Sequence, residues 1–290
     1  MFPIFSDLKG FEKETLYIIG NGFDLYHGIP TSYKDFYCWL NCHGHKDFVK
    51  KMETTFPKIE GDTNLLWKDF ETALGEYDEE EIYNKLTEKR DQNWDDAIPK
   101  DVEQEMNMLV SQVYSLLKEW VKYIDIEEVG SLLKLPKESQ YFTFNYTMTL
   151  ERVYGIPPEN ILHIHNSIGN GDKLIVGHAN EQRKEMDEPN FYKEKGKENI
   201  ILQMNRLAKH VSQIKMKHID YFKSLVGIKR IVVLGHSYSE IDIQYFGAIN
   251  EIARDAHWHF SKHSINDEEK LNGLICALEI DAKNRWIFNF

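Results

Sequence analysis

The sequence predicts an α/β fold in which a mostly parallel β-sheet carries helices on both faces. Short apolar runs of strand length alternate with helical patterns through the C-terminal half, and this alternation favours parallel strands. Several of the runs end at glycine or at a group of polar residues, which is typical of the carboxyl edge of an open α/β sheet. A gap of more than a hundred residues with helical character separates the first predicted strand from the second. The fold is therefore expected to be a sheet domain with a large helical insertion.

Seven segments have the length and apolar content of strands: residues 15–20, 139–144, 160–165, 173–176, 229–235, 256–260 and 284–289. The clearest helix covers residues 103–124, where apolar side chains recur on one face. A second long helix is expected from Leu207 to Leu225, and the polar stretch 178–199 is expected to be a loop. We assign residues 1–30 and 136–290 to the sheet core. Residues 31–135 are the helical insertion, which we expect to cap the ligand side of the sheet.

Composition narrows the class of protein. The chain has 290 residues and a formal net charge of −12, which argues against broad binding to nucleic acid backbones. It contains no run of eighteen or more apolar residues, so no membrane span is expected. Residues 1–10 lack the pattern of a secretory signal, and three cysteines are too few for a disulfide framework. These features predict a cytoplasmic protein.

Charge is nevertheless unevenly distributed. Residues 53–105 contain 17 acidic and 6 basic residues, whereas residues 193–230 contain 10 basic and 3 acidic ones. Solvated helix faces explain most such stretches. The basic stretch is the place where nucleic acid or an acidic partner would be expected to dock, with Lys209, Lys215 and Lys217 as contacts.

The first strand ends in a glycine-rich segment whose residues are candidates for holding a dinucleotide: Gly20, Asn21, Gly22, Phe23 and Asp24. Glycine permits a tight turn and a close approach of ligand to the backbone, and a following helix presents its N–H groups to an anion. The dinucleotide fingerprint requires a further Gly or Ala where this chain has Leu25. A purely structural turn is therefore an alternative, and for Asp24 capping the helix is favoured over contacting a ligand.

Three later segments place polar residues at strand ends. Thr143-Phe144-Asn145-Tyr146-Thr147 follows the second strand, and His165 lies at the end of the third. The strand 229–235 runs into Gly235-His236-Ser237. Because open α/β sheets bind ligands outside the carboxyl ends of their strands, these segments are expected to share one site with the glycine-rich segment.

In this order the four segments resemble a sirtuin-type NAD-binding domain. The Gly-Asn-Gly-Phe-Asp opening, the Gly28-Ile29-Pro30-Thr31-Ser32-Tyr33 segment that follows it, the Phe-Asn-Tyr-Thr motif and the Gly-His-Ser loop resemble the bacteriophage abortive infection AbiH family. The resemblance runs through most of the chain. It implies a Rossmann-type, sirtuin-like core and a role in antiphage defence.

The resemblance also implies a chemistry. Cleavage of the nicotinamide–ribose bond of NAD passes through an oxocarbenium-like centre and needs a group that orients the attacking oxygen. By similarity, Asn145 and His165 are the catalytic candidates, and Thr143 lies at the same site. Phosphates would lie on the glycine-rich segment. Backbone N–H groups and a hydroxyl would close over the other half of the cofactor from three residues: Gly235, His236 and Ser237.

The chain also departs from the sirtuin pattern. Thr147 replaces an aspartate that holds the nicotinamide amide, and Asn166 replaces the glycine after His165. No pair of Cys-x-x-Cys motifs follows, so the zinc module of the deacylases is missing. Protein deacylation is not expected. The resemblance favours an NAD glycohydrolase, or a protein that binds a nucleotide without turnover.

Other interpretations remain open from the sequence. Asn145 is also a common turn former, and His165 is also consistent with a satisfied core histidine. Gly235-His236-Ser237-Tyr238-Ser239 is close to a hydrolase nucleophile elbow but lacks its last glycine. The cluster at Cys38, Cys42, His43 and His45 matches no common zinc site, and no metal is expected. The expected ligand is a small nucleotide, and the sequence leaves open a phage protein as trigger and assembly into a homo-oligomer.

Overall fold

The computed structural model describes residues 10–56, 65–88, 97–169, 171, 173–178 and 191–290. The chain divides into two compact units. The first, here called the sheet unit, comprises Met1–Thr31, Val121–Leu174 and His210–Phe290. The second, here called the helical unit, comprises Ser32–Trp120 and Ile175–Lys209.

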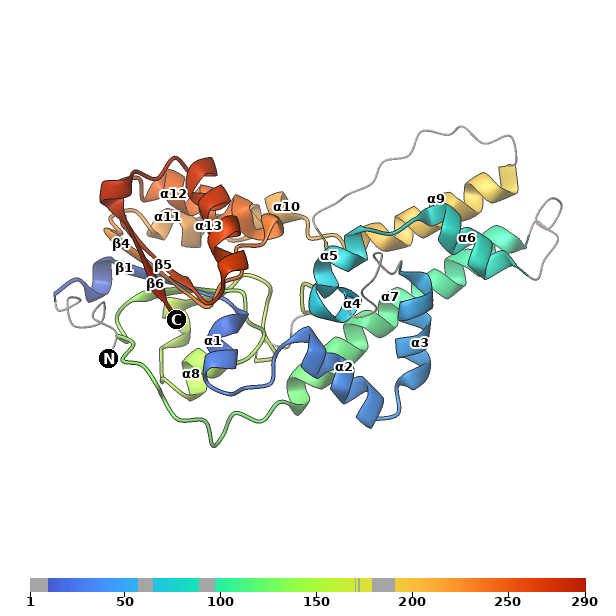
Figure 1. The fold of residues 1–290 in the computed structure, drawn as a ribbon, viewed down its shortest axis with the longest axis horizontal. Helices are drawn as coiled ribbons and strands as arrows, with labels where there is room; N and C mark the ends of the chain where they lie inside the picture. The colour runs from blue at the N-terminus through green and yellow to red at the C-terminus, as the bar shows by residue number, and fades with distance from the viewer. Residues whose placement is uncertain (1–9, 57–64, 89–96, 170, 172, 179–190) are drawn as a thin grey trace. The chain divides into compact units, whose positions relative to one another are not determined.

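The sheet unit is built on six parallel strands in the order β3-β2-β1-β4-β5-β6 (Figure 1). Their bounds are β1 Thr15–Ile19, β2 Gln140–Thr143, β3 Ile161–His163, β4 Arg230–Leu234, β5 His257–Lys262 and β6 Arg285–Asn289. This is the strand order of doubly wound dinucleotide-binding sheets. The order reverses between β1 and β4, so the point where such sheets bind their ligands lies beyond the carboxyl ends of these two strands.

Central parallel strands are apolar along their whole length because helices cover both sheet faces. All five residues of β1 are buried. On one face, Tyr17 and Tyr141 stack in a cluster that includes Phe23 and Leu150. On the other, Phe142 meets the aromatic side chains of two further helices. Successive residues of a strand therefore pack into two separate cores, one on each face of the sheet.

The helices of the sheet unit are short and lie on the two sheet faces, with α1 and α8 on one side and α11 and α12 on the other (Figure 1). Their bounds are α1 Asn21–Tyr26, α8 Thr149–Arg152, α10 Val211–Lys217, α11 Ile219–Ser224, α12 Ile243–Ile252 and α13 Ile265–Ala277. Four three-residue 3-10 helices complete the described part of this unit: Glu12–Glu14, Pro158–Asn160, Glu240–Asp242 and Ala282–Asn284.

The helical unit contains α2 Tyr33–Cys42, α3 Lys46–Thr55, α4 Leu65–Lys68, α5 Phe70–Gly75, α6 Glu79–Thr87, most of α7 Ile98–Tyr123, and α9 Phe191–Asn205. Its core is aromatic: the ring of Phe36 lies 5.0 Å from that of Trp120, and Trp67 stacks on Phe70. A capping box fixes the start of α2, since Ser32 and Asp35 each bind the other's backbone N–H.

Six of the seven predicted strands are present, but residues 173–176 form none. This segment leads from the sheet unit into the helical unit, where His178 forms an isolated bridge with Ala208. The expected long helix from Leu207 to Leu225 is two short helices that meet at His218. The helix predicted at 103–124 begins earlier, at Ile98.

The polar stretch 178–199 was expected to be a loop, and for residues 191–199 this is wrong because they belong to α9; residues 179–190 lie outside the described part of the chain. The helix has no amphipathic pattern, since four of its polar residues are buried: Glu194, Lys197, Asn199 and Gln203. Tertiary partners satisfy two of them, as Asn199 donates to Pro99 O and Lys197 pairs with Glu80. A helix held by buried polar contacts leaves no periodic signal.

The division into units also differs from the predicted domain boundaries. Residues 121–135 belong to the sheet unit and residues 175–209 to the helical unit. The second difference follows from α9, which packs against α6: a side chain on Gly196 would come within 2.4 Å of the Tyr83 ring. That the insertion caps the ligand side of the sheet stays a prediction.

Candidate functional site

The loops that follow β1 and β4 meet at the point where the strand order reverses. The N–H of Gly20 donates to the Leu234 carbonyl at 3.0 Å, and that of Gly22 to the Gly235 carbonyl at 2.7 Å. The N–H of Gly235 donates in turn to the Ser261 hydroxyl at 2.9 Å. Three of the predicted cofactor-binding residues are therefore brought together: Gly22 bonds to Gly235 directly, and Gly20 bonds to the residue before Gly235.

The glycines are needed for this packing. A Cβ on Gly20 would lie 2.6 Å from the Gly235 carbonyl oxygen, and one on Gly22 would lie 2.8 Å from it. Gly235 has a φ of +64°, and a Cβ there would lie 2.2 Å from the Phe23 nitrogen. Contacts this short exclude any side chain. Backbone packing alone thus explains the glycines of this segment, as the alternative of a purely structural turn requires, without a ligand.

The remaining loop residues differ in exposure. Asn21 is exposed and donates through Nδ2 to the Thr31 carbonyl at 3.0 Å. Ser237 is also exposed, so its hydroxyl faces solvent beside the packed loops. Phe23 is fully buried, and its ring packs against Tyr154. Among these three, only Asn21 and Ser237 present polar side chains at the surface.

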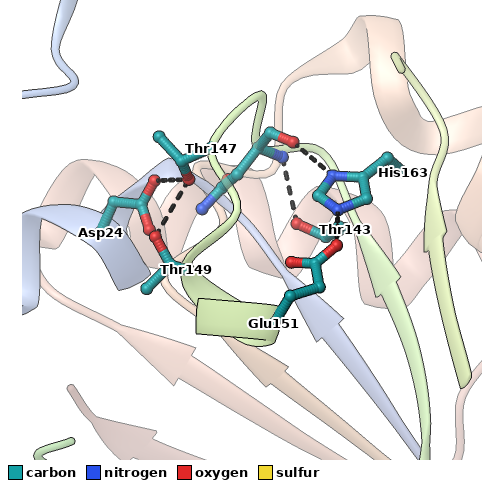
Figure 2. A network of polar contacts seen from close by, with 7 residues as sticks. Asp24, Thr143, Thr147, Thr149, Glu151 and His163 are labelled. Atoms are coloured by element: carbon teal, nitrogen blue, oxygen red, sulfur yellow. Dashed lines mark hydrogen bonds and ion pairs between the residues drawn. The ribbon is translucent and has the colours of Figure 1, made fainter. Parts of the chain in front are cut away.

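Asp24 is fully buried and accepts a hydrogen bond from the Thr147 hydroxyl at 2.6 Å. Thr149 extends the chain, since its hydroxyl donates to that of Thr147 at 3.1 Å (Figure 2). Burial raises the pKa of Asp24, and hydrogen bonds from Thr147, Thr149 and Asn145 oppose that rise. No side chain caps α1, so Asp24 does not serve as the helix cap that the sequence allowed; it ties α1 to the loop after β2.

That loop carries Asn145, which is held through its backbone. Its N–H donates to the Thr143 hydroxyl at 3.1 Å, and its carbonyl accepts from His163 Nδ1 at 2.9 Å. The side chain is 7% exposed, and its Oδ1 has no hydrogen-bond donor among the described residues. A buried acceptor without a donor is uncommon and calls for an explanation. Asn145 is thus a fixed residue with an unused amide oxygen.

His163 forms an ion pair that sequence reasoning missed. Its Nε2 lies 2.9 Å from Glu151 Oε1, while Nδ1 faces the Asn145 carbonyl (Figure 2). The backbone carbonyl accepts, and so does the Glu151 carboxylate when it is ionised, so both ring nitrogens can donate. The geometry thus offers an acceptor to each ring nitrogen of His163.

His165 lies at the same edge but in an aromatic environment. Thr143 and His163 are register partners, so Asn145 and His165 each lie two residues beyond the ends of neighbouring strands. His165 is 3% exposed, and its ring meets those of Phe144 at 5.5 Å and Tyr245 at 5.9 Å. The histidine that bonds to Asn145 is His163, through the backbone carbonyl.

His236 has both ring nitrogens engaged. Nδ1 accepts from the Tyr238 N–H at 2.8 Å, and Nε2 lies 3.3 Å from Asp242 Oδ2. Tyr238, rather than Ser237, has the positive φ of 54°. In a nucleophile elbow the serine itself occupies the strained position, so this loop does not have hydrolase geometry.

Asn166 adopts the conformation that glycine would have at this position. Its φ is +61°, a left-handed value that asparagine tolerates better than most residues. Its Nδ2 donates to the Lys173 carbonyl at 2.7 Å. Asn166 can therefore replace the glycine of the His-Gly pattern without changing the course of the backbone after His165.

The basic stretch is not one exposed surface. It is divided between the two units, and several of its lysines pair with acidic residues. Lys209 is buried and lies 2.7 Å from Glu71 within the helical unit. It cannot contact a partner, and this corrects its inclusion among the docking residues.

Within the described ranges, no three His, Cys, Asp or Glu side chains are grouped so that they could hold a metal ion. Across the same residues, no helix combines the length and apolar character needed to span a bilayer.

Comparison with known proteins gives one match. The profile of a family described as bacteriophage abortive infection AbiH matches residues 16–262. No curated protein and no solved structure matches significantly. The matched region includes β1 from its second residue, all of β2 to β5, and every predicted site residue. The chain belongs to the bacteriophage abortive infection AbiH family.

Proposed function

We propose that this chain is a cytoplasmic effector of abortive infection whose sheet unit binds NAD, or a related dinucleotide, and hydrolyses it. Family membership suggests the role in phage defence. The reaction would take NAD⁺ and water to nicotinamide, ADP-ribose and a proton. The nicotinamide–ribose bond breaks with its electron pair leaving on nicotinamide, and a water oxygen forms the new bond to the ribose carbon.

The topology of the sheet supports a dinucleotide as the ligand. The strand order is that of doubly wound dinucleotide-binding sheets, and the order reverses between β1 and β4. Asn21 and Ser237 carry exposed polar side chains on the loops that meet there. They are suited to donate to a pyrophosphate at that point.

The observation that carries the catalytic part of the proposal is the unused Oδ1 of Asn145. The residue is fixed by Thr143 and His163, yet its buried amide oxygen has no donor among the described side chains and backbone groups. A water molecule donating to this oxygen would be oriented with a lone pair toward the ribose carbon. Asn145 would orient the water without taking its proton, and His165 at the same edge would accept that proton.

The site must open before it can work. Asn145 and His165 are 7% and 3% exposed, and the N–H groups of Gly22 and Gly235 bind protein oxygens. A dinucleotide therefore reaches the edge only when the loops after β1 and β4 separate. A closed ground state suits an enzyme that would deplete NAD, because such an activity must be withheld until infection.

The test is nicotinamide release from NAD by purified protein, with calorimetric NAD binding and cellular NAD followed during phage infection. Asn145→Ala is compared with Asn160→Ala, which removes an exposed amide bonded to the Lys137 carbonyl in the same unit. We expect NAD depletion during infection, with slow release by the closed purified protein, in the wild type and in Asn160→Ala, and neither in Asn145→Ala. Release by Asn145→Ala at the wild-type rate would remove Asn145 from the reaction.

A non-catalytic nucleotide sensor is the second candidate, because His236 has no free ring nitrogen and His165 is enclosed by aromatic rings. A sensor binds NAD without releasing nicotinamide, even in infected cells. Its antiphage protection would also survive Asn145→Ala as long as binding does. Absence of both binding and release, in vitro and in infected cells, would exclude NAD for both candidates.

A further inference from the structure

A cavity of about 220 Å³ opens in the sheet unit beside the loop that carries Asn145. The C-terminal end of α7 and the residues after it form one part of its lining, and α8 and its preceding loop form another. It is smaller than the roughly 300–1,000 Å³ pockets that hold drug-sized ligands, so its occupant is a small molecule. None of the roles proposed above for residues at the carboxyl edge of the sheet uses this cavity.

Five of the eight lining residues are apolar. Val121 and Ile126 are buried, and Ile124, Met148 and Ile168 are partly buried. Gly169 packs so closely on Met148 that a Cβ would lie 2.5 Å from its sulfur atom, so the wall beside the cavity is tightly filled. These side chains give an aliphatic or aromatic body a surface to pack on, beside the polar groups that line the rest of the cavity.

Two cations complete the lining. Lys122 and Arg152 are both exposed, and neither has an acidic partner among the described residues. In a chain of net charge −12, two unpaired cations on one small apolar cavity are well placed for an anionic group at its mouth.

We propose that this cavity is a binding site for a small organic monoanion with an apolar body, such as a medium-chain carboxylate. The body occupies the aliphatic pocket and the carboxylate lies against Lys122 and Arg152. Thr147 also lines the cavity, and its hydroxyl donates to Asp24. The ligand therefore contacts the same loop that holds Asn145, and this makes the cavity a candidate effector site. Its existence does not depend on the NAD proposal.

The experiment measures binding of octanoate to the full chain by calorimetry, in the absence of nucleotide. We expect saturable one-to-one binding that is at least fivefold weaker for octanol, which lacks the charge, and for acetate, which lacks the body. Arg152→Glu is expected to weaken octanoate binding at least about fivefold, since exposed charge pairs contribute modestly. Arg254→Glu is the matched control on a cation outside the cavity and should leave binding unchanged.

A second variant fills the cavity instead of changing its charge. Ile168→Trp should abolish octanoate binding while leaving the circular dichroism of the protein unchanged, and the threonine methyl resonances of Thr147 should shift on titrating octanoate into the wild type. Equal affinity for octanol and octanoate would overturn the role of the cations. Unsaturable binding, or full binding by both Arg152→Glu and Ile168→Trp, would overturn the site.

Discussion

The carboxyl edge of this sheet is built in two ways, and the two halves can be compared directly. Beyond β2 and β3, side chains hold the backbone: Asp24, Thr147 and Thr149 form one hydrogen-bonded chain, and Glu151 with His163 forms another. Beyond β1 and β4, backbone packs on backbone, and glycines leave the room for it. The loops beyond β2 and β3 are held by charged groups and hydrogen-bond donors of side chains. The loops beyond β1 and β4 pack closely because their glycines have no side chains.

Each half also contains a buried histidine beside a carboxylate, and the two differ in their protons. His163 pairs with Glu151, and its other nitrogen faces a carbonyl. His236 lies near Asp242, and its other nitrogen faces an N–H. The hydrogen bonds therefore leave room for two ring protons on His163 and one on His236. The second partner of each histidine, more than its carboxylate, thus determines how many ring nitrogens can donate.

The largest effect should come from adding a methyl group to the half built on backbone packing. Gly235→Ala would place a Cβ 2.2 Å from the Phe23 nitrogen at a φ of +64°. We expect the free energy of unfolding of the sheet unit to fall by more than about 4 kcal/mol, since both sterics and backbone strain oppose the change. Urea unfolding followed by hydrogen exchange in β1 and β4 measures it.

Gly247→Ala is the control for this substitution. It lies in α12, where the nearest atom to a new Cβ is a Leu278 methyl at 3.9 Å. Alanine should stabilise the helix by about 0.5–1 kcal/mol. If Gly235→Ala were as stable as Gly247→Ala, the loops after β1 and β4 would not be packed as described.

The second-largest expected effect distinguishes the two histidine–carboxylate pairs. Glu151→Gln removes the carboxylate that pairs with the buried His163 and should cost about 2–4 kcal/mol of unfolding free energy, because a buried ion pair loses one partner. Asp242→Asn keeps an acceptor for a neutral ring and should cost less than about 1 kcal/mol. Denaturant unfolding of the two variants checks the difference. Equal losses would mean that both rings carry the same charge.

The same contrast explains what the sequence could predict. Six strands were found because their apolar runs end at glycine or polar residues, and those ends are the carboxyl edge. The Glu151–His163 pair joins residues twelve apart on separate elements, and Asp24 meets Thr147 across more than a hundred residues. No local pattern encodes such pairings. Helix α9 was missed for a related reason, since its buried polar residues are satisfied only by tertiary partners.

His259 in β5 provides a third histidine, and none of the described carboxylates forms an ion pair with it. Burial, and then the charges of Arg230 and His257, lower its pKa to about 4. An unfolded histidine titrates near 6.5, so between pH 6.5 and 4 the unfolded chain takes up a proton that the folded chain resists. The stability contributed by neutral His259 is complete above pH 6.5 and is lost as the pH falls toward 4.

His259→Gln tests this. From pH 7 to pH 5 the wild type should lose about 1–2 kcal/mol more unfolding free energy than the variant, because only the wild type has the depressed histidine. Parallel denaturant titrations at the two pH values measure the difference. Identical slopes with pH would show that the ring at 259 titrates as it does in the unfolded chain.

The smallest expected effect concerns the protons on the two histidine rings, which can be observed directly. Nitrogen-15 spectra of selectively labelled histidine at neutral pH should show two protonated nitrogens for His163, and for His236 one protonated Nε2 beside an unprotonated Nδ1. Glu151→Gln should shift the His163 ring toward the neutral form, because the carboxylate that favours its second proton is gone. Asp242→Asn should leave the His236 pattern unchanged, because the Tyr238 N–H still requires an unprotonated Nδ1. Two protons on His236 would break that hydrogen bond and, with it, the account of how the loop after β4 keeps its shape.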